Sequence, residues 1–144
     1  MGNLIIRKTL SLEGAKKLAA RAVQKATELG VGAAIAIVDA GGHLIYFERL
    51  DGTIIVSANI TIGKAVTALT FDRPGKVLEE AVSVERKAMM ANFGITTMVP
   101  LMGSYPIKAA GETVGAIAVG GTAKGAGEND EIIVLYALEN FADS

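Results

Sequence analysis

The strongest constraint on the fold is a pair of short apolar segments joined by a glycine turn. Residues 33–38 form a continuous apolar run of strand length, and Ala40-Gly41-Gly42 follows almost directly. A continuous run, unlike an alternating one, is typical of a strand that is covered on both faces. Residues 43–49 then return as a second strand, so the pattern predicts a β-hairpin whose first strand lies inside a layered fold.

The second strand of this hairpin begins with the only histidine of the chain. Because side chains alternate along a strand, we expect every second residue from this histidine to share its face. That face consists of His43, Ile45, Phe47 and Arg49. On a straight strand, His43 and Arg49 would lie about 20 Å apart. Within one subunit they cannot share one small substrate; they either bracket a long ligand or meet residues of different subunits.

Four further segments are predicted to be helical. Ser11 is expected to cap a helix that Gly30 ends, because apolar residues recur between them at helical spacing. A helix from about Ser57 to Phe71 fits a period of 3.6 better than a period of 2, although it is rich in β-branched residues. The other two are expected at residues 76–90 and, opened by Asn129, Asp130 and Glu131, at residues 129–141.

The second half of the chain is expected to complete the sheet. Residues 105–109 and 113–119 read as two strands joined by a tight turn, and a further short strand is expected near residues 98–102. Strands and helices are grouped rather than strictly alternating, which argues against a parallel Rossmann-type sheet. The order therefore predicts an α+β domain with a roughly five-stranded antiparallel sheet. We expect residues 1–144 to form a single domain.

Composition narrows the class of protein. The chain has 51% apolar residues, 17 glycines and only 5% aromatic residues. Small residues let backbones approach closely, which favours flat packing of helices on a sheet. The formal net charge of −1 gives no basic surface for nucleic acid. With no cysteine there is neither a disulfide nor a thiolate site. No apolar run is long enough for a membrane span, and the first residues do not resemble a signal peptide, so we expect a cytoplasmic protein.

His43 is the first candidate for chemistry, because imidazole binds haem iron or other metals and acts as a base near neutral pH. The alternative is a histidine that caps its turn by hydrogen bonds to the backbone.

Arg49 and Asp51 either contact a ligand or pair with each other and stiffen the loop. Lys64 lies in a small apolar helix, where it is either a surface residue or a partly buried cation that faces a pocket, with Thr67 on the same side.

The glycine-rich segment at residues 120–127 fits neither phosphate-loop pattern, and Asp130 and Glu131 in the following helix would repel phosphate. We expect it to be a flexible loop beside a pocket. Asp130 or Glu131 either serves as an acid or base or is only a partner of the helix dipole.

The methionines near residues 89–102 are expected to fill gaps in a core or an interface. The three serines open to a catalytic triad, Ser57, Ser83 and Ser104, do not sit in a nucleophile elbow.

Several short motifs occur in an order that resembles a known family. They are Val38-Asp39-Ala40-Gly41-Gly42-His43-Leu44, Arg49-Leu50-Asp51-Gly52, Gly63-Lys64-Ala65, Arg73-Pro74, Gly115-Ala116-Ile117-Ala118-Val119-Gly120-Gly121 and Asp130-Glu131. Together they resemble the GlcG/HbpS-like family, which also forms the C-terminal domain of PduO-type proteins. The resemblance covers about residues 11–142.

The resemblance implies a profilin-like fold, with helices packed on both faces of the antiparallel sheet, and a homo-oligomer. It also implies haem as a candidate cofactor, with His43 as the iron ligand and with Lys64 and Arg49 for the propionates. The ligand-binding residues predicted in this way are His43, Arg49, Asp51, Lys64, Thr67, Gly120, Gly121 and Asp130. Their pocket is expected between the sheet and the helix that carries Lys64, with Ile45, Phe47, Val66 and Val119 as its walls.

Three functions remain open at this point. The first is a small-molecule or haem-binding accessory protein of a diol, glycerol or glycolate type of catabolic pathway. The second is an enzyme acting on a small hydroxy acid, aldehyde or polyol, with His43, Lys64 or Asp130 transferring protons or placing substrate. The third is a non-catalytic assembly module whose subunits bury apolar faces against one another.

Overall fold

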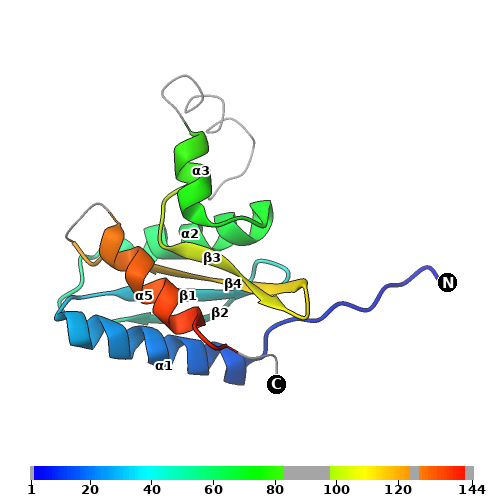
Figure 1. The fold of residues 1–144 in the computed structure, drawn as a ribbon, viewed down its shortest axis with the longest axis horizontal. Coiled ribbons are helices and arrows are strands. Elements are labelled where there is room, and N and C mark those ends of the chain that lie inside the picture. Colours follow the sequence, from blue (N-terminus) through cyan, green and yellow to red (C-terminus); the bar gives the residue numbers. More distant parts are fainter. Residues whose placement is uncertain (1, 83–97, 124–126, 142–144) are drawn as a thin grey trace.

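The computed structural model describes residues 2–82, 98–123 and 127–141. Within these ranges an antiparallel sheet of four strands, in the order β2-β1-β4-β3, lies between helices (Figure 1). The strands are β1 (Ala34–Asp39), β2 (Leu44–Arg49), β3 (Ser104–Ala109) and β4 (Glu112–Gly120). The helices are α1 (Leu12–Leu29), α2 (Ser57–Phe71), α3 (Gly75–Ala81) and α5 (Glu128–Leu138). The predicted α+β class with an antiparallel sheet is confirmed, and the profilin-like name stays a prediction.

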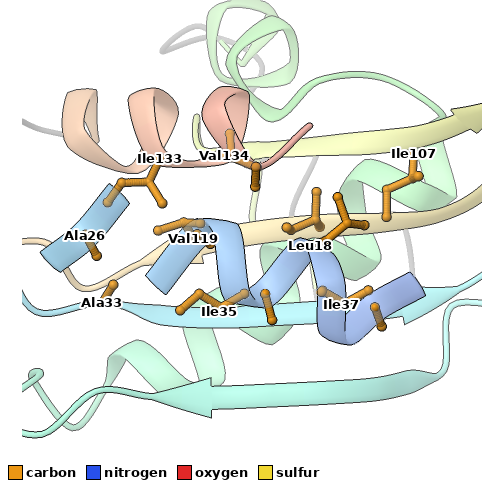
Figure 2. Packing of buried hydrophobic residues seen from close by; sticks show 14 of the residues in the cluster. Leu18, Ala26, Ala33, Ile35, Ile37, Ile107, Val119, Ile133 and Val134 are labelled. Atoms are coloured by element: carbon orange, nitrogen blue, oxygen red, sulfur yellow. The ribbon is translucent and has the colours of Figure 1, made fainter. Parts of the chain in front are cut away.

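Large branched side chains fill the layer between the sheet and the helices α1 and α5. The sheet contributes Ile35 and Ile37 from β1 and Ile117 and Val119 from β4, all fully buried. Leu18 and four alanines of α1 pack against them, as do Ile133 and Val134 of α5 (Figure 2). This layer holds most of the buried apolar surface, so it is the main source of hydrophobic stabilisation.

The opposite face of the sheet is built from small residues. Ala36, Val38, Ala116 and Ala118 of the two central strands pack against Ala65 and Ala68 of α2. Gly120 allows an even closer contact with α2, since a Cβ there would lie only 2.2 Å from Thr61 Oγ1. The expectation that small residues allow a close helix-on-sheet contact is confirmed for α2. Helices therefore cover both faces of the sheet, as predicted.

The predicted ends of the first helix agree with the structure. Ser11 Oγ accepts a hydrogen bond from the Gly14 N–H, which places Ser11 at the N-cap. Gly30 ends α1 in the left-handed conformation with a φ of 67°, which glycine adopts without strain. Both signals are local, so the sequence alone was sufficient to find them.

Two predicted elements differ from the structure. The strand expected near residues 98–102 is absent, because these residues form an irregular segment that leads into β3, so the sheet of the described ranges has four strands rather than five. The last helix begins at Glu128 after Gly127, rather than at Asn129, and ends at Leu138 rather than at Phe141. Gly127 has a φ of 98° and starts the helix without a side-chain cap, which a search for an Asn or Asp cap misses.

The alternation predicted along β2 is also wrong. Val38 pairs with Leu44 and Ile37 pairs with Tyr46, so the register shifts and Ile45 is an extra residue between them. Such a bulge moves the following side chains to the other face. Ile45 packs against the large cluster under α1 and α5, whereas Phe47 packs against the alanine cluster under α2. The common face on which the predicted pocket walls depended therefore does not exist, and Val119 also faces the large cluster.

Only part of the helix predicted at residues 76–90 is described. Helix α3 (Gly75–Ala81) confirms its start, and residues 83–90 lie outside the described residues, as do Ser83, Met89 and Met90. In the ranges that the structure describes, no helix combines the length and apolar character needed to cross a bilayer.

Candidate functional site

Lys64 of α2 is one of the most deeply buried side chains, with only 2% of its surface exposed. Its neighbours Gly63 and Ala65 are small, so this turn of α2 lies close to the sheet. The Lys64 Nζ donates to the Val119 carbonyl at 2.5 Å and to Asp130 Oδ2 at 3.2 Å. Burial lowers the pKa of the Lys64 ammonium, and the Asp130 carboxylate opposes that shift. The lysine joins α2 to the end of β4 and to the first turn of α5.

Asp130 is fixed from a second direction. Thr122, which follows β4, donates its hydroxyl to Asp130 Oδ1 at 2.8 Å, so both carboxylate oxygens are occupied. Gly103 passes so close that a Cβ there would lie 2.8 Å from Lys64 Nζ. We call this group of Lys64, Val119, Thr122 and Asp130 the lysine end of the sheet.

Glu131 extends the polar cluster toward β3. Its carboxylate accepts from the Gly103 N–H at 3.0 Å and from the Tyr105 hydroxyl, and Lys76 Nζ lies 3.8 Å away. Burial and the hydrogen bond to Glu131 raise the pKa of the Tyr105 phenol well above its ordinary value. Glu131 thus holds the start of β3 and the glycine before it, whereas the neighbouring Asp130 holds Lys64 and Thr122.

Two threonines of α2 lie in the same region but differ in their hydrogen bonds. Thr67 Oγ1 donates to the Gly63 carbonyl at 2.7 Å and accepts from the Val99 N–H at 2.8 Å. Thr61 Oγ1 is buried against Gly120 and has no hydrogen-bond partner among the described residues. Gly121 packs with a φ of 76° against Thr53 and Ser57. The predicted glycines therefore serve close packing and a turn, and their contact with a ligand stays a prediction.

His43 lies at the opposite end of the central strand, in the turn between β1 and β2. Its side chain is 82% exposed, and its Nδ1 lies 3.4 Å from Asp39 Oδ1. The same carboxylate oxygen accepts from the backbone N–H groups of Gly41 and His43. Burial raises the pKa of the Asp39 carboxyl, but these bonds and the nearby imidazole more than offset it, so the pKa lies below its usual value. We call the turn Asp39–His43 the hairpin end.

This arrangement leaves one imidazole nitrogen available. Nδ1 faces the turn, where the ring lies beside Gly41 and Asp39, so Nε2 is the nitrogen on the solvent side of an exposed ring. A carboxylate beside one nitrogen orients the ring and makes the other a better metal ligand. Among the described residues Asp39, rather than the imidazole ring, caps this turn, and the binding of a metal or ligand by the ring stays a prediction.

The strand register separates the predicted site residues into two groups. Ile35 pairs with Val119 at the lysine end, and Asp39 of the same strand adjoins His43, so the two ends are four residues, or about 13 Å, apart. Arg49 of β2 and Gly120 of β4 both pair with Ala34 of β1, so Arg49 lies at the same end of the sheet as Lys64. Two strand spacings, or about 10 Å, separate the backbone of Arg49 from that of Gly120. Arg49 and Asp51 are both exposed, and within the described ranges they form no ion pair with each other.

A cleft of about 340 Å³ adjoins the hairpin end. Arg7, Ala40, Gly41 and Leu69 are among the residues that line it. Nothing in the sequence around Arg7 indicates a binding role, because Arg7 precedes the first helix and belongs to no motif. Thr122 was missed for the same reason, since nothing in a loop sequence indicates that its hydroxyl meets a carboxylate eight residues away.

Comparisons with known proteins agree with this architecture. A family described as "Haem degrading protein HbpS-like" matches residues 10–139. Protein GlcG of Escherichia coli (strain K12) is 32% identical over 110 residues, which cover 76% of this chain and 80% of GlcG. A crystal structure of a double mutant of Streptomyces reticuli HbpS has 28% identity and a TM-score of 0.86, and it covers 96% of this chain and 91% of that chain.

A second solved structure, described as a PduOC:Heme complex, is similar in fold. Its TM-score is 0.78 at 24% identity, and the match covers 91% of this chain and 94% of that chain. At this level of identity, the likeness shows a shared fold alone.

Proposed function

The chain belongs to the HbpS-like family of haem degrading proteins, and from this premise we propose that it is a haem-binding accessory protein with His43 as the iron ligand. The observation that carries the proposal is the state of the His43 ring. It is exposed, its Nδ1 faces Asp39, and its Nε2 has no hydrogen-bond partner in the part of the chain that the structure describes. Of the two ends of the sheet, the hairpin end is the one that offers an accessible imidazole.

The residues of the hairpin end fit part of what haem requires. Haem would supply an iron centre, which the imidazole of His43 would hold. Arg7 lines the adjoining cleft and is a suitable cation for a propionate. A cleft of about 340 Å³ is at the small end of ligand pockets, so it would hold only part of so large a group. A second copy of the chain would have to cover the rest, which is consistent with the homo-oligomer that we propose.

Lys64 is less suited to the propionate role that the resemblance suggested. Its ammonium already has a carboxylate partner in Asp130 and lies at the other end of β1 from His43. A propionate would have to displace Asp130 from a buried pair, and the charge left unpaired would be costly. We therefore assign the propionate to Arg7 rather than to Lys64 or Arg49.

The pathway and location are finer parts of the same proposal. The resemblance to the GlcG/HbpS-like family is the support for an accessory role in a glycolate, diol or glycerol type of catabolism. A cytoplasmic location remains a prediction from the sequence. Both depend on genetic context rather than on the geometry of the site.

Titration with ferric haem tests the binding proposal. We expect a shifted Soret band that saturates in the wild type, that is lost or changed in His43→Ala, and that needs about 10- to 100-fold more haem in Asp39→Asn. Arg49→Ala is the matched control, because it removes an exposed charged side chain at the other end of the sheet. An unshifted spectrum in the wild type, or an identical spectrum in His43→Ala, would refute the assignment.

A second candidate function rests on Lys64. A buried amine with a lowered pKa beside a carboxylate is suited to proton transfer on a small hydroxy acid, aldehyde or polyol. Turnover that disappears in Lys64→Met, while circular dichroism shows an intact fold, would favour this enzyme. Equal turnover in Lys64→Met and the wild type would exclude it.

A further inference from the structure

An extended segment precedes the first helix and leaves the body of the protein (Figure 1). We call residues 3–8 the N-terminal arm. Its base is held in place, because the Lys8 N–H donates to Glu112 Oε1 at 3.2 Å and the Leu10 N–H donates to the Val114 carbonyl at 2.8 Å. Thr9 Oγ1 also accepts from the Ala40 N–H at 3.0 Å. The arm therefore leaves the body in a defined direction.

The arm carries three consecutive large apolar side chains that are almost wholly exposed. Leu4, Ile5 and Ile6 expose 90%, 84% and 98% of their surfaces. Single exposed apolar residues are common, but a contiguous group on one short segment marks a contact surface. In the described ranges, the structure gives residues 3–7 no backbone hydrogen bond, so both edges of the extended arm are also open to pairing.

A cleft of about 830 Å³, which we call the arm-base cleft, lies at the base of the same arm. Leu10, Ala109, Val114 and Phe141 form its apolar lining, and charged residues of α1 and of the C-terminal segment also line it. Lys8 and Thr9 form part of the cleft wall. The arm therefore starts at this cleft, and its tip points away from it (Figure 1).

We propose that two copies of the chain exchange their N-terminal arms, so that Leu4–Ile6 of each copy fill the arm-base cleft of the other. When a twofold axis relates the two copies, their arms run antiparallel, and the tip of each arm lies at the base of the other arm. Leu4 is four residues from Lys8, a reach of about 14 Å. The extended, β-branched arms can then pair with each other as a two-stranded ribbon.

A second copy fits these observations because the contact is self-complementary. Every copy supplies one apolar tip and one cleft, and the arm that forms the wall of a cleft is directed away from it. At roughly 100 Å² for each buried Leu or Ile side chain, six side chains and the walls that they cover bury about 1,000 Å². That area is where specific interfaces begin. The inference does not use His43, but it shares Arg7 with the haem proposal, because Arg7 belongs to the arm and also lines the hairpin-end cleft. The test below is made without haem, so its outcome does not depend on that proposal.

The absence of cysteine from the sequence makes a direct test possible. Copies carrying Leu4→Cys are mixed with isotope-labelled copies carrying Ala109→Cys, and the oxidised mixture is analysed by mass spectrometry. We expect a disulfide-linked dimer of one labelled and one unlabelled copy. Ile132→Cys, an exposed site on α5, replaces Leu4→Cys as the control and should give at least about 10-fold less.

Two results would overturn the proposal. One is a mixed dimer no more abundant than in the Ile132→Cys control. The other is a Leu4→Cys/Ala109→Cys double variant that closes its disulfide within one chain, which would show that the arm folds onto its own cleft. As an independent measurement, Ile5→Asp with Ile6→Asp should raise the dimer dissociation constant about 100-fold in sedimentation equilibrium, and an unchanged constant would also contradict arm exchange.

Discussion

The two ends of the central strands carry polar groups in opposite states. At the lysine end, the ammonium of Lys64 is buried and both oxygens of Asp130 are occupied within the protein. At the hairpin end, the ring of His43 is exposed, and only one of its nitrogens faces a protein group. The same sheet thus supports one closed and one open polar site.

The difference suggests a division of roles. The closed site joins α2 to β4 and α5, which are distant from α2 in sequence, so its hydrogen bonds contribute to structure. The open site costs little stability, because the hydrogen bonds of its turn come from Asp39 and the backbone rather than from the imidazole ring. We expect changes at the lysine end to alter folding and changes at the hairpin end to alter binding.

The largest effect is expected from Asp130→Ala, which leaves the buried Lys64 ammonium without its carboxylate. Breaking a buried ion pair in this way typically costs about 3–5 kcal/mol. Urea denaturation measures the loss of unfolding free energy. The double variant Lys64→Met/Asp130→Ala should recover most of it, because it removes the unpaired charge. If the single variant costs less than about 1 kcal/mol, the lysine end is not the closed structural site described above.

The threonines of α2 allow a matched comparison within the lysine-end region. Thr67→Val removes a hydroxyl with two hydrogen bonds and should lower the unfolding free energy by about 1–2 kcal/mol. Thr61→Val removes a buried hydroxyl without a partner among the described residues, so it should be neutral or stabilising by up to about 1 kcal/mol. Thermal unfolding of both variants measures the difference. Equal losses would show that the two hydroxyls are equally satisfied.

A smaller effect should appear with pH. Burial holds the pKa of Lys64 below its ordinary value of 10.5, so between these two values the unfolded chain binds more protons than the folded one. Stability from this group therefore rises as the pH increases toward 10.5 and is lowest below the folded pKa. The unfolding free energy of the wild type, relative to Lys64→Met, should increase as the pH rises toward 10.5. A relative decrease would mean that the folded protein favours the charged lysine.

The smallest effect on stability is expected at the hairpin end. His43→Ala should change the unfolding free energy by less than about 0.5 kcal/mol, because the ring is exposed and the turn keeps its backbone hydrogen bonds. Asp39→Ala should cost about 1 kcal/mol, since it removes the acceptor of two N–H groups. Chemical denaturation of the pair tests whether the imidazole is free of a structural role, and a loss above about 1 kcal/mol in His43→Ala would contradict that.

Much of the fold could be predicted because its signals are local. The caps at Ser11 and Gly30 lie within a few residues of the helix that they define, and the glycine turn adjoins both of its strands. Helix α2 was found through its period, although its β-branched residues favour strands. The bulge at Ile45 and the irregular segment at residues 98–102 have no comparable signal, since both depend on how the chain pairs across the sheet.

Residues of the polar cluster could be selected from the sequence, but their arrangement in space could not. Lys64 and Asp130 were both selected, yet their pairing joins positions 66 residues apart. The separation of His43 from Lys64 follows from the register of β1 with β4, which a single sequence does not reveal. Thr122 and Arg7 were missed because their roles arise only from tertiary contacts.

The most direct test of the assigned open site is the ligation of ferric haem, read by electron paramagnetic resonance with and without free imidazole. We predict a histidine-ligated signal in the wild type and in folded Lys64→Met, its loss in His43→Gly, and its return when imidazole is added to His43→Gly. A signal that survives in His43→Gly without imidazole, or that disappears in folded Lys64→Met, would contradict the assignment of the open site to His43.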